Sequence, residues 1–245
     1  MPDFVLAIDA GTTSVRTMIV DTAGTVVARA KQPCALSYPK PGQVEQNPEA
    51  LWRSTLQAVD DALNAANITR ADLAVIGITS QRSCCLVWQR ATGKPVAPLV
   101  SWQDLRGMQR AAEFQAMGLP MQPQSAAAKL ESVVDAISDG RGRVAQQQLA
   151  WGNVDSYLIA RLTAGAAHVT DPSQACATAY FDYETGGWSH AILEMQRLPE
   201  SFFPRIVDTS GVVAETDASI FGATIPIAAI VGDQQSAAIA QACDN

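Results

Sequence analysis

Histidine and basic residues are scarce in this chain of 245 residues. Only two histidines occur, His168 and His190, so a histidine-rich metal centre is excluded and a Ser-His-Asp triad could be built in very few ways. The 17 lysines and arginines are outnumbered by 24 aspartates and glutamates, giving a net charge of −7. Binding to a phosphate backbone needs clustered basic residues, so we expect no nucleic-acid partner.

Long hydrophobic runs and paired cysteines are also missing from the sequence. No apolar run approaches the roughly 18 residues that a membrane helix needs, and the longest candidate, 225–231, fits a single buried strand. The five cysteines include no C-x-x-C spacing, which favours a reducing compartment over a disulfide framework. The first four residues carry no basic segment. We therefore expect a cytoplasmic protein with no secretory signal and no membrane partner.

Hydrophobic periodicity predicts a domain of mixed α/β type. Apolar residues make up 48% of the chain, enough for a sizeable core. Strands are predicted over 4–8, 15–20, 25–30, 73–79, 85–88, 96–100 and 223–231. A helix is predicted over about 48–65, with Asn47 as its N-cap and Pro48 at its first position, and another over 234–242.

The middle of the chain, from about 103 to 217, has a helical pattern interrupted by glycine and proline. Helices are predicted over 104–117, 127–137, 147–162 and 189–196. This segment resembles an insertion into the strand-rich part. The remaining strands predict a mixed five-stranded sheet with Asp9 and Asp233 at the same edge, because both follow buried strands at polar corners.

The turn after the first strand reads Asp9-Ala10-Gly11-Thr12-Thr13-Ser14. Such a turn can direct backbone N–H groups and hydroxyls at phosphate oxygens, while the Asp9 carboxylate holds Mg²⁺ through water. Strand alternation places Arg16 on the same face as Ser14, where a guanidinium could contact phosphate. The same residue types are also typical of an ordinary hairpin turn, and Arg16 could equally form a surface ion pair.

A second polar corner, Gly232-Asp233-Gln234-Gln235, lies between a buried strand and a helix. Ligands of open α/β sheets bind at this place, and a carboxylate there can accept a proton from a substrate hydroxyl. Aspartate is also a favoured N-cap, so Asp233 could simply begin the helix. The two interpretations are compatible.

Polar residues and one aromatic follow two further strands. Ser80-Gln81-Arg82-Ser83 comes after the strand at 73–79, and Trp102 follows the strand at 96–100. Arginine and glutamine can hold hydroxyl groups while a carbon skeleton lies on an indole, which is what a polyol site needs. A core tryptophan and a surface salt bridge are the simpler alternatives.

Six blocks carry a resemblance to a known family. They are Ala7-Ile8-Asp9-Ala10-Gly11-Thr12-Thr13-Ser14 with Arg16, Tyr38-Pro39-Lys40-Pro41-Gly42 with Glu45, Ile76-Gly77-Ile78-Thr79 with Gln81-Arg82, Val154-Asp155 with Leu158-Ile159, Val169-Thr170-Asp171, and Gly232-Asp233-Gln234-Gln235. In this order they resemble the FGGY carbohydrate kinases, and the resemblance covers essentially the whole chain.

The resemblance implies an actin-like, ribonuclease-H-like α/β fold, with a mixed sheet and flanking helices. Family members have two domains, and substrate and ATP meet in the cleft between them. Residues 1–245 would form the N-terminal substrate-binding domain, with the helical insertion at about 103–217 and without the C-terminal ATP-binding domain. The implied cofactors are ATP and Mg²⁺. The implied partners are a small polyol or ketose and the missing C-terminal kinase domain. Apart from the resemblance, the small apolar residues of the helix predicted over 234–242 would allow a homo-oligomer.

The resemblance also implies a role for each site residue. Gly11, Thr12, Thr13 and Arg16 would bind phosphate, Asp9 the metal, and Asp233 would be the general base; Arg82, Trp102, Gln234, Gln81 and Ser83 would contact the substrate.

Two departures put glycerol in doubt as the substrate. Ser83 stands where glycerol-phosphorylating members carry a glutamate, and Gln124 stands about where they carry a tyrosine. A catalytically silent polyol-binding fragment and another actin-like ATPase are the alternative interpretations.

Overall fold

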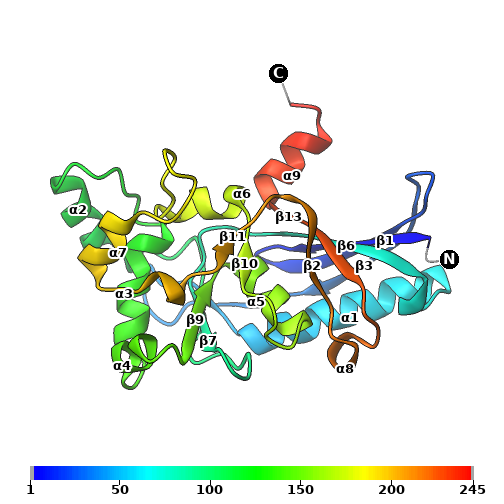
Figure 1. Ribbon diagram of the computed structural model, residues 1–245, viewed down its shortest axis with the longest axis horizontal. Coiled ribbons are helices and arrows are strands. Elements are labelled where there is room, and N and C mark those ends of the chain that lie inside the picture. Colours follow the sequence, from blue (N-terminus) through cyan, green and yellow to red (C-terminus); the bar gives the residue numbers. More distant parts are fainter. Residues whose placement is uncertain (1–2, 244–245) are drawn as a thin grey trace.

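A six-stranded mixed sheet forms the centre of the computed structural model, which describes residues 3–243 (Figure 1). Its strands lie in the order β12 (Ser210–Glu215), β13 (Pro226–Gly232), β6 (Leu73–Ser80), β1 (Phe4–Ala10), β2 (Ser14–Val20) and β3 (Val26–Pro33). The three neighbouring strands β13, β6 and β1 run parallel, and the remaining pairs are antiparallel. The carboxyl ends of the three parallel strands therefore meet at one edge of the sheet.

Two helices cover one face of this sheet. Helix α1 (Pro48–Ala66) packs on β2 and β3, and α5 (Val154–Leu162) packs on β6. The predicted cap of α1 is confirmed, because the Asn47 side chain accepts a hydrogen bond from the Ala50 N–H at 3.0 Å. Arg161 joins the two helices: it donates to Glu49 at 2.8 Å, and its guanidinium lies over the Trp52 ring.

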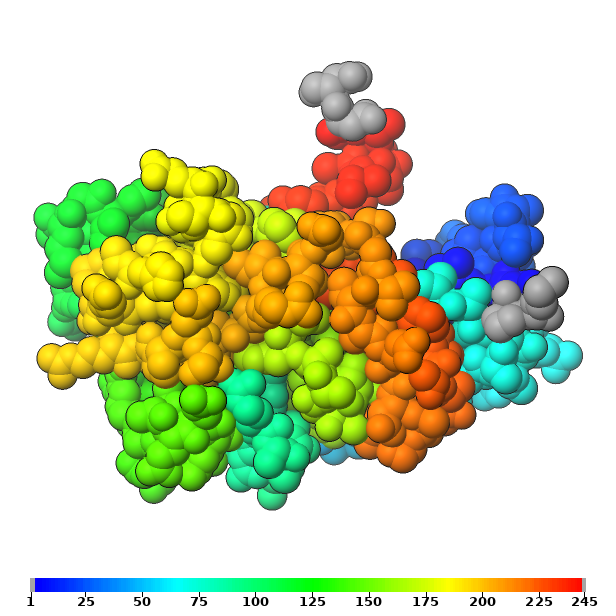
Figure 2. Space-filling model, viewed as in Figure 1, coloured from blue at the N-terminus to red at the C-terminus, as the bar shows by residue number. Residues whose placement is uncertain are grey.

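The opposite face of the sheet is more open. Along β1 the side chains alternate: Leu6 and Ile8 are fully buried, whereas Val5 is exposed and Asp9 is only partly buried. Helix α9 (Asp233–Ala240) leaves the sheet edge and projects from the body of the molecule (Figures 1 and 2). No residue of α9 is buried.

A second apolar core lies among the helices on the left of Figure 1. Trp151 is its centre, in contact with the rings of Tyr180, Trp188 and Phe203. The helices of this part are α2 (Met108–Ala116), α3 (Ala126–Asp135), α4 (Gly140–Ala145), α6 (Pro172–Ala175) and α7 (His190–Gln196), while α8 (Ala218–Phe221) lies near α5. Short 3₁₀ helices cover Arg70–Asp72, Cys176–Thr178 and Glu200–Phe202.

Three small sheets connect the two cores. They pair β7 (Leu86–Gln89) with β9 (Leu149–Gly152), β10 (Val169–Thr170) with β11 (Arg205–Ile206), and β5 (Glu45–Gln46) with β4 (Leu36–Ser37) and β8 (Leu99–Val100). None of the helices within residues 3–243 combines the length and apolar character that a bilayer crossing requires.

The mixed sheet with flanking helices, the N-terminal meander and α1 agree with the sequence predictions, whereas the number of strands and one predicted helix do not. The sheet has six strands rather than five, because β12 pairs with β13 inside the range expected to be helical. The helix predicted over 147–162 is a strand, β9, followed by α5, because Leu149–Gly152 pairs with β7 and the chain turns at Asn153.

Candidate functional site

The predicted polar corners lie together at the carboxyl edge of the three parallel strands. In the strand register Ala10 is opposite Ser80, and Ser80 is opposite Gly232. Asp9 and Asp233 therefore lie at the same edge, as the sequence predicted. The Asp233 carboxylate is close enough to contribute to raising the pKa of Asp9.

Asp9 and Arg16 face each other across the first hairpin. Their pairing in the β1–β2 register puts both on the open face of the sheet, with Arg16 Nη1 3.3 Å from Asp9 Oδ2. Burial raises the pKa of the Asp9 carboxyl, although the Arg16 guanidinium opposes the shift. The pair leaves a carboxylate and a guanidinium accessible to solvent, since more than half of the Arg16 side chain is exposed.

The turn between β1 and β2 has unused backbone donors. Gly11 N–H donates to the Ser14 carbonyl at 3.1 Å, and a Cβ on Gly11 would lie only 3.3 Å from that oxygen. Within the part of the chain that the structure describes, no hydrogen bond is donated by the backbone N–H of Thr12 or Thr13. Free N–H groups at a tight turn form a concavity that suits an anion.

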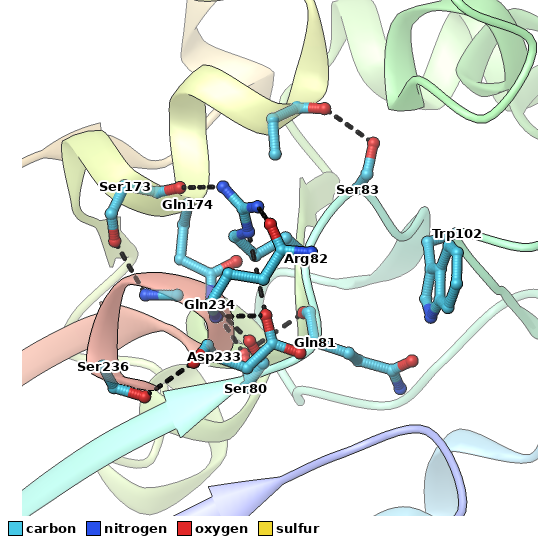
Figure 3. Close-up of polar contacts among 12 residues, drawn as sticks. Ser80, Gln81, Arg82, Ser83, Trp102, Ser173, Gln174, Asp233, Gln234 and Ser236 are labelled. Carbon is cyan, nitrogen blue, oxygen red and sulfur yellow. Dashed lines mark hydrogen bonds and ion pairs between the residues drawn. The ribbon is translucent and has the colours of Figure 1, made fainter. Parts of the chain in front are cut away.

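Arg82 links the Asp233 corner to the segment around Ser173 (Figure 3). Its guanidinium donates to the Ser173 carbonyl at 3.2 Å and to the Gln234 side chain, and its Nε lies 3.8 Å from Asp233 Oδ1. Its side chain is 15% exposed, whereas that of Asp233 is 43% exposed. The arginine is thus fixed by protein contacts while the carboxylate beside it remains open to a ligand.

Gly232 allows this arrangement because the Arg82 side chain packs against its Cα, in the space that a Cβ would occupy. A Cβ at Gly232 would lie 2.4 Å from Arg82 Cδ and 2.8 Å from Gln235 Oε1. Gly232 is also the N-cap of α9, and Asp233 is its first helical residue, with Oδ1 accepting from the Gln234 N–H at 2.8 Å. The expectation that Asp233 is itself the N-cap is therefore wrong.

Ser83 and Trp102 differ in how firmly protein contacts hold their side chains. Ser83 has a left-handed backbone, with φ of 59°, and its hydroxyl donates to the Ala177 carbonyl at 2.7 Å. The Trp102 indole is 41% exposed and donates to Thr12 Oγ1 at 3.0 Å. The indole therefore offers a flat apolar surface next to the β1–β2 turn.

Gln81 is buried rather than open to solvent. Its exposed fraction is 1%, and its amide is bonded to Thr12 and Gln46. The prediction that Gln81 contacts a substrate hydroxyl stays a prediction.

Sequence reasoning missed two buried polar residues around the site. Lys129 Nζ donates to the carbonyls of Ser83 and Ser101, at 3.1 and 2.9 Å, and burial lowers its pKa. Gln46 donates to the Thr12 carbonyl at 2.7 Å. A lone lysine on the apolar face of 126–135 was the available signal for the first. No sequence pattern in the two-residue strand that contains Gln46 marked this residue as part of the site.

Similarity to known proteins identifies the family of this chain. A model of the FGGY family of carbohydrate kinases, N-terminal domain, matches residues 4–240. The chain belongs to the FGGY family of carbohydrate kinases. This FGGY chain is 39% identical over 253 residues to the glycerol kinase of Rhizobium rhizogenes, covering 99% of the chain and 51% of that protein.

Other relatives match this FGGY chain over a similar length. The glycerol kinase of Trichlorobacter lovleyi is 38% identical over 252 residues, with 99% of the chain and 51% of that protein covered. The chain thus spans about half the length of the curated relatives it matches.

Solved structures show the same fold. A Plasmodium falciparum glycerol kinase with ADP superposes with a TM-score of 0.91 at 24% identity, covering 98% of the FGGY chain and 50% of the other. A xylulose kinase from Lactobacillus acidophilus gives 0.83 at 20% identity, covering 96% and 49%.

Oxygen ligands for a metal are few in this FGGY chain. Within residues 3–243 there is no cluster of three or more His, Cys, Asp or Glu residues that could hold a metal ion. Asp9 and Asp233 offer carboxylate oxygens at the open edge. Carboxylate donors that leave most positions to water and phosphate suit Mg²⁺.

Proposed function

We propose that this chain is the substrate-binding half of an ATP-dependent kinase that phosphorylates a hydroxyl of a small polyol or ketose. The observation that carries the proposal is the contact of Arg82 with both Asp233 and Gln234, at the sheet edge that also holds Asp9 and Arg16. A hydroxyl-binding group, a base and phosphate-binding groups are then close together. Phosphoryl transfer depends mainly on such positioning and on neutralised charge.

Asp233 is proposed as the general base. The substrate hydroxyl gives its proton to the Asp233 carboxylate, and the hydroxyl oxygen forms a bond to the γ-phosphorus of ATP. The bond between that phosphorus and the bridging oxygen breaks, so ADP is the leaving group. Asp233 suits this role because its carboxylate is the more open member of its pair with Arg82.

Substrate binding is assigned to Arg82 and Gln234, which contact Asp233, and to Trp102, which contacts Thr12. Arg82 and Gln234 would hold substrate hydroxyls, and the exposed face of Trp102 would carry the carbon skeleton. The Ser83 hydroxyl already donates its hydrogen bond to the Ala177 carbonyl, so it would act toward a ligand only as an acceptor. These contacts favour a small polyhydroxylated substrate.

Phosphate binding is assigned to the first turn. The free N–H groups of Thr12 and Thr13, the close approach allowed by Gly11 and the exposed guanidinium of Arg16 are suited to phosphate oxygens. Mg²⁺ supplies further neutralisation of phosphate charge when bound, and Asp9 would hold it through water.

The 245 residues alone are proposed to transfer phosphate negligibly. In the relatives the matched half is followed by as much chain again. A C-terminal domain is the proposed partner that would cover the adenine and exclude water from the cleft. ATP affinity of the 245 residues is therefore expected to be weak.

A chimera tests the proposed transfer. These residues would replace the matching half of the Rhizobium rhizogenes glycerol kinase, and ADP release would be measured over a panel of polyols and ketoses. We expect turnover with at least one of them, and a decrease of about 10²- to 10⁴-fold for Asp233→Asn. A chimera that binds ATP but phosphorylates no member of the panel, or an unaffected Asp233→Asn variant, contradicts the proposal.

A further inference from the structure

We propose that Gln46 is a positioning residue that fixes the phosphate turn and the Trp102 indole relative to each other. The inference rests on the proposed function, because it assigns Gln46 to the support of that same site. Within the described residues the Gln46 side chain is hydrogen-bonded to Thr12 and Gln81, not to Asp233. It acts through Thr12 and Gln81.

Four hydrogen bonds form a closed loop with one branch. Gln46 Nε2 donates to the Thr12 carbonyl at 2.7 Å, and Gln81 Nε2 donates to Gln46 Oε1 at 2.7 Å. Thr12 Oγ1 donates to Gln81 Oε1 at 3.1 Å, which closes the loop. Trp102 Nε1 donates to the same Thr12 hydroxyl at 3.0 Å. The backbone and the side chain of Thr12 are thus both held by the glutamine pair.

The direction of each bond is determined by chemistry. The indole N–H can only donate and the Thr12 carbonyl can only accept. The Thr12 hydroxyl accepts from Trp102, so its own proton is available for Gln81 Oε1. Turning the Gln46 amide over would place its oxygen against the Thr12 carbonyl oxygen. The loop therefore has a single self-consistent arrangement of donors.

Because both glutamines are buried, breaking this arrangement costs free energy. Gln46 is 2% exposed and Gln81 is 1% exposed, so neither amide could replace a lost partner with bulk water. The loop also joins three parts of the fold. Gln46 is on β5, Gln81 follows β6, and Thr12 is in the β1–β2 turn.

Trp102 depends on the loop through the one hydrogen bond that its indole N–H donates. It is 41% exposed, and its N–H donates to Thr12. Loss of Gln46 would release the Thr12 carbonyl and Gln81, and through them the hydroxyl that holds the indole. The platform for the substrate skeleton would then lose its fixed position beside the phosphate turn.

The test measures Trp102 in the ligand-free chain. Acrylamide quenching of fluorescence is recorded for wild type, Gln46→Met and Gln46→Glu, and the signal of the matching Trp102→Phe protein is subtracted from each to isolate Trp102. Gln32→Met is the control, because Gln32 donates to Asp61 away from the site. Thermal unfolding verifies that each variant is folded.

We expect quenching of Trp102 to rise in both Gln46 variants and to stay unchanged in Gln32→Met. The dissociation constant for the polyol should rise roughly three- to tenfold, as expected for one lost hydrogen-bond link. Unchanged quenching in a folded Gln46 variant overturns the proposal. So does failure of both Gln46 variants to fold, because Gln46 would then be needed for the fold itself. Altered quenching without polyol binding by any variant would support the loop and count against the proposed function alone.

Discussion

Arg82 and Asp233 meet at the open edge of the main sheet, with Arg82 Nε 3.8 Å from Asp233 Oδ1. The two residues come from the ends of neighbouring parallel strands, β6 and β13, whose register brings Ser80 opposite Gly232. Gly232 permits the contact because it carries no Cβ. This relationship leads directly to the first prediction.

Gly232→Ala should disturb Arg82 while leaving the fold largely intact. The new methyl group would lie 2.4 Å from Arg82 Cδ, so the arginine must shift away from Asp233 and Gln234. We expect polyol affinity to fall about tenfold or more, with a loss of about 1–3 kcal/mol in the free energy of unfolding. Titration calorimetry and a denaturation curve measure the two effects.

Gly187→Ala is the matched control for Gly232→Ala. A Cβ at Gly187 would come no closer than 3.6 Å to Thr185 Oγ1, and no strained backbone angle is involved. Both quantities should stay near wild type there. Equal polyol affinity in the two variants would show that the close approach at Gly232 is unimportant for the site.

Asp155→Asn should alter how stability depends on pH. Burial raises the pKa of Asp155 from 3.8 to about 7, although Thr170 donates to its carboxylate at 2.7 Å. Between these pH values the folded chain holds a proton that the unfolded chain has lost. The contribution of Asp155 to the free energy of unfolding is therefore full below about pH 4 and is lost as the pH rises to about 7.

The side chain introduced by Asp155→Asn would not titrate, so the variant would not lose stability as the pH rises. Its free energy of unfolding, relative to that of wild type, should therefore increase between about pH 4 and pH 7, by a few kcal/mol at most. Denaturation curves over a pH series measure the difference. Asp217→Asn is the control of opposite sign, since hydrogen bonds from Ser219 lower the pKa of the partly exposed Asp217. Parallel pH profiles for wild type and Asp155→Asn would rule out a titrating Asp155.

Lys129→Met should loosen the two segments that bear Arg82 and Trp102. The lysine donates to the carbonyls of Ser83 and Ser101, each next to one of those residues. Methionine fills a similar volume but leaves the Ser83 carbonyl without its lysine donor, whereas the Ser101 carbonyl still accepts from the Asp104 N–H at 3.1 Å. The lost hydrogen bonds cost about 1–3 kcal/mol, partly offset by removal of a buried charge. We expect a lower free energy of unfolding and weaker polyol binding.

Lys94→Met is the control for Lys129→Met, because Lys94 is exposed. It should leave the denaturation midpoint and the polyol affinity unchanged. A Lys129→Met variant that binds polyol as tightly as wild type would mean that the carbonyl contacts do not support the site.

The surface of α9 should promote self-association. No residue of this helix is buried, and Ile239 is 69% exposed. Exposed apolar surface at a projecting helix tends to be covered by another chain. Light scattering over a concentration series should show a rising mean mass, reduced by Ile239→Ser and unaffected by Val212→Ser, which replaces an equally exposed residue on β12. A strictly monomeric chain at all concentrations would argue against an interface here.

The sequence predicted the sheet edge that bears Asp9 and Asp233, but it did not predict the outer strand β12. Asp9 is the next-to-last residue of β1 and Asp233 directly follows β13, and both strands have a strong hydrophobic signal. Strand β12 was missed because Ser210–Glu215 has no buried residue and no clear alternation. Strand β9 was merged with α5 because a short apolar run has the same composition in a strand and in a buried helix.

The supports of the site depend on contacts between distant segments. Gln46 and Gln81 are 35 residues apart, and Lys129 reaches a carbonyl 46 residues away. No local pattern records such contacts. Sequence therefore identified Arg82, Trp102 and Asp233 as candidates, while Gln46 and Lys129 became visible only in three dimensions.

Polyol binding by the chain, with and without Arg82, tests the central claim most directly. Titration calorimetry with a panel of polyols and ketoses would be performed on wild type and on Arg82→Ala, with folding of both verified by circular dichroism. The account predicts heat of binding for at least one member of the panel with wild type and its loss with Arg82→Ala. Absence of binding by wild type to every member, or equal binding by folded Arg82→Ala, would contradict it.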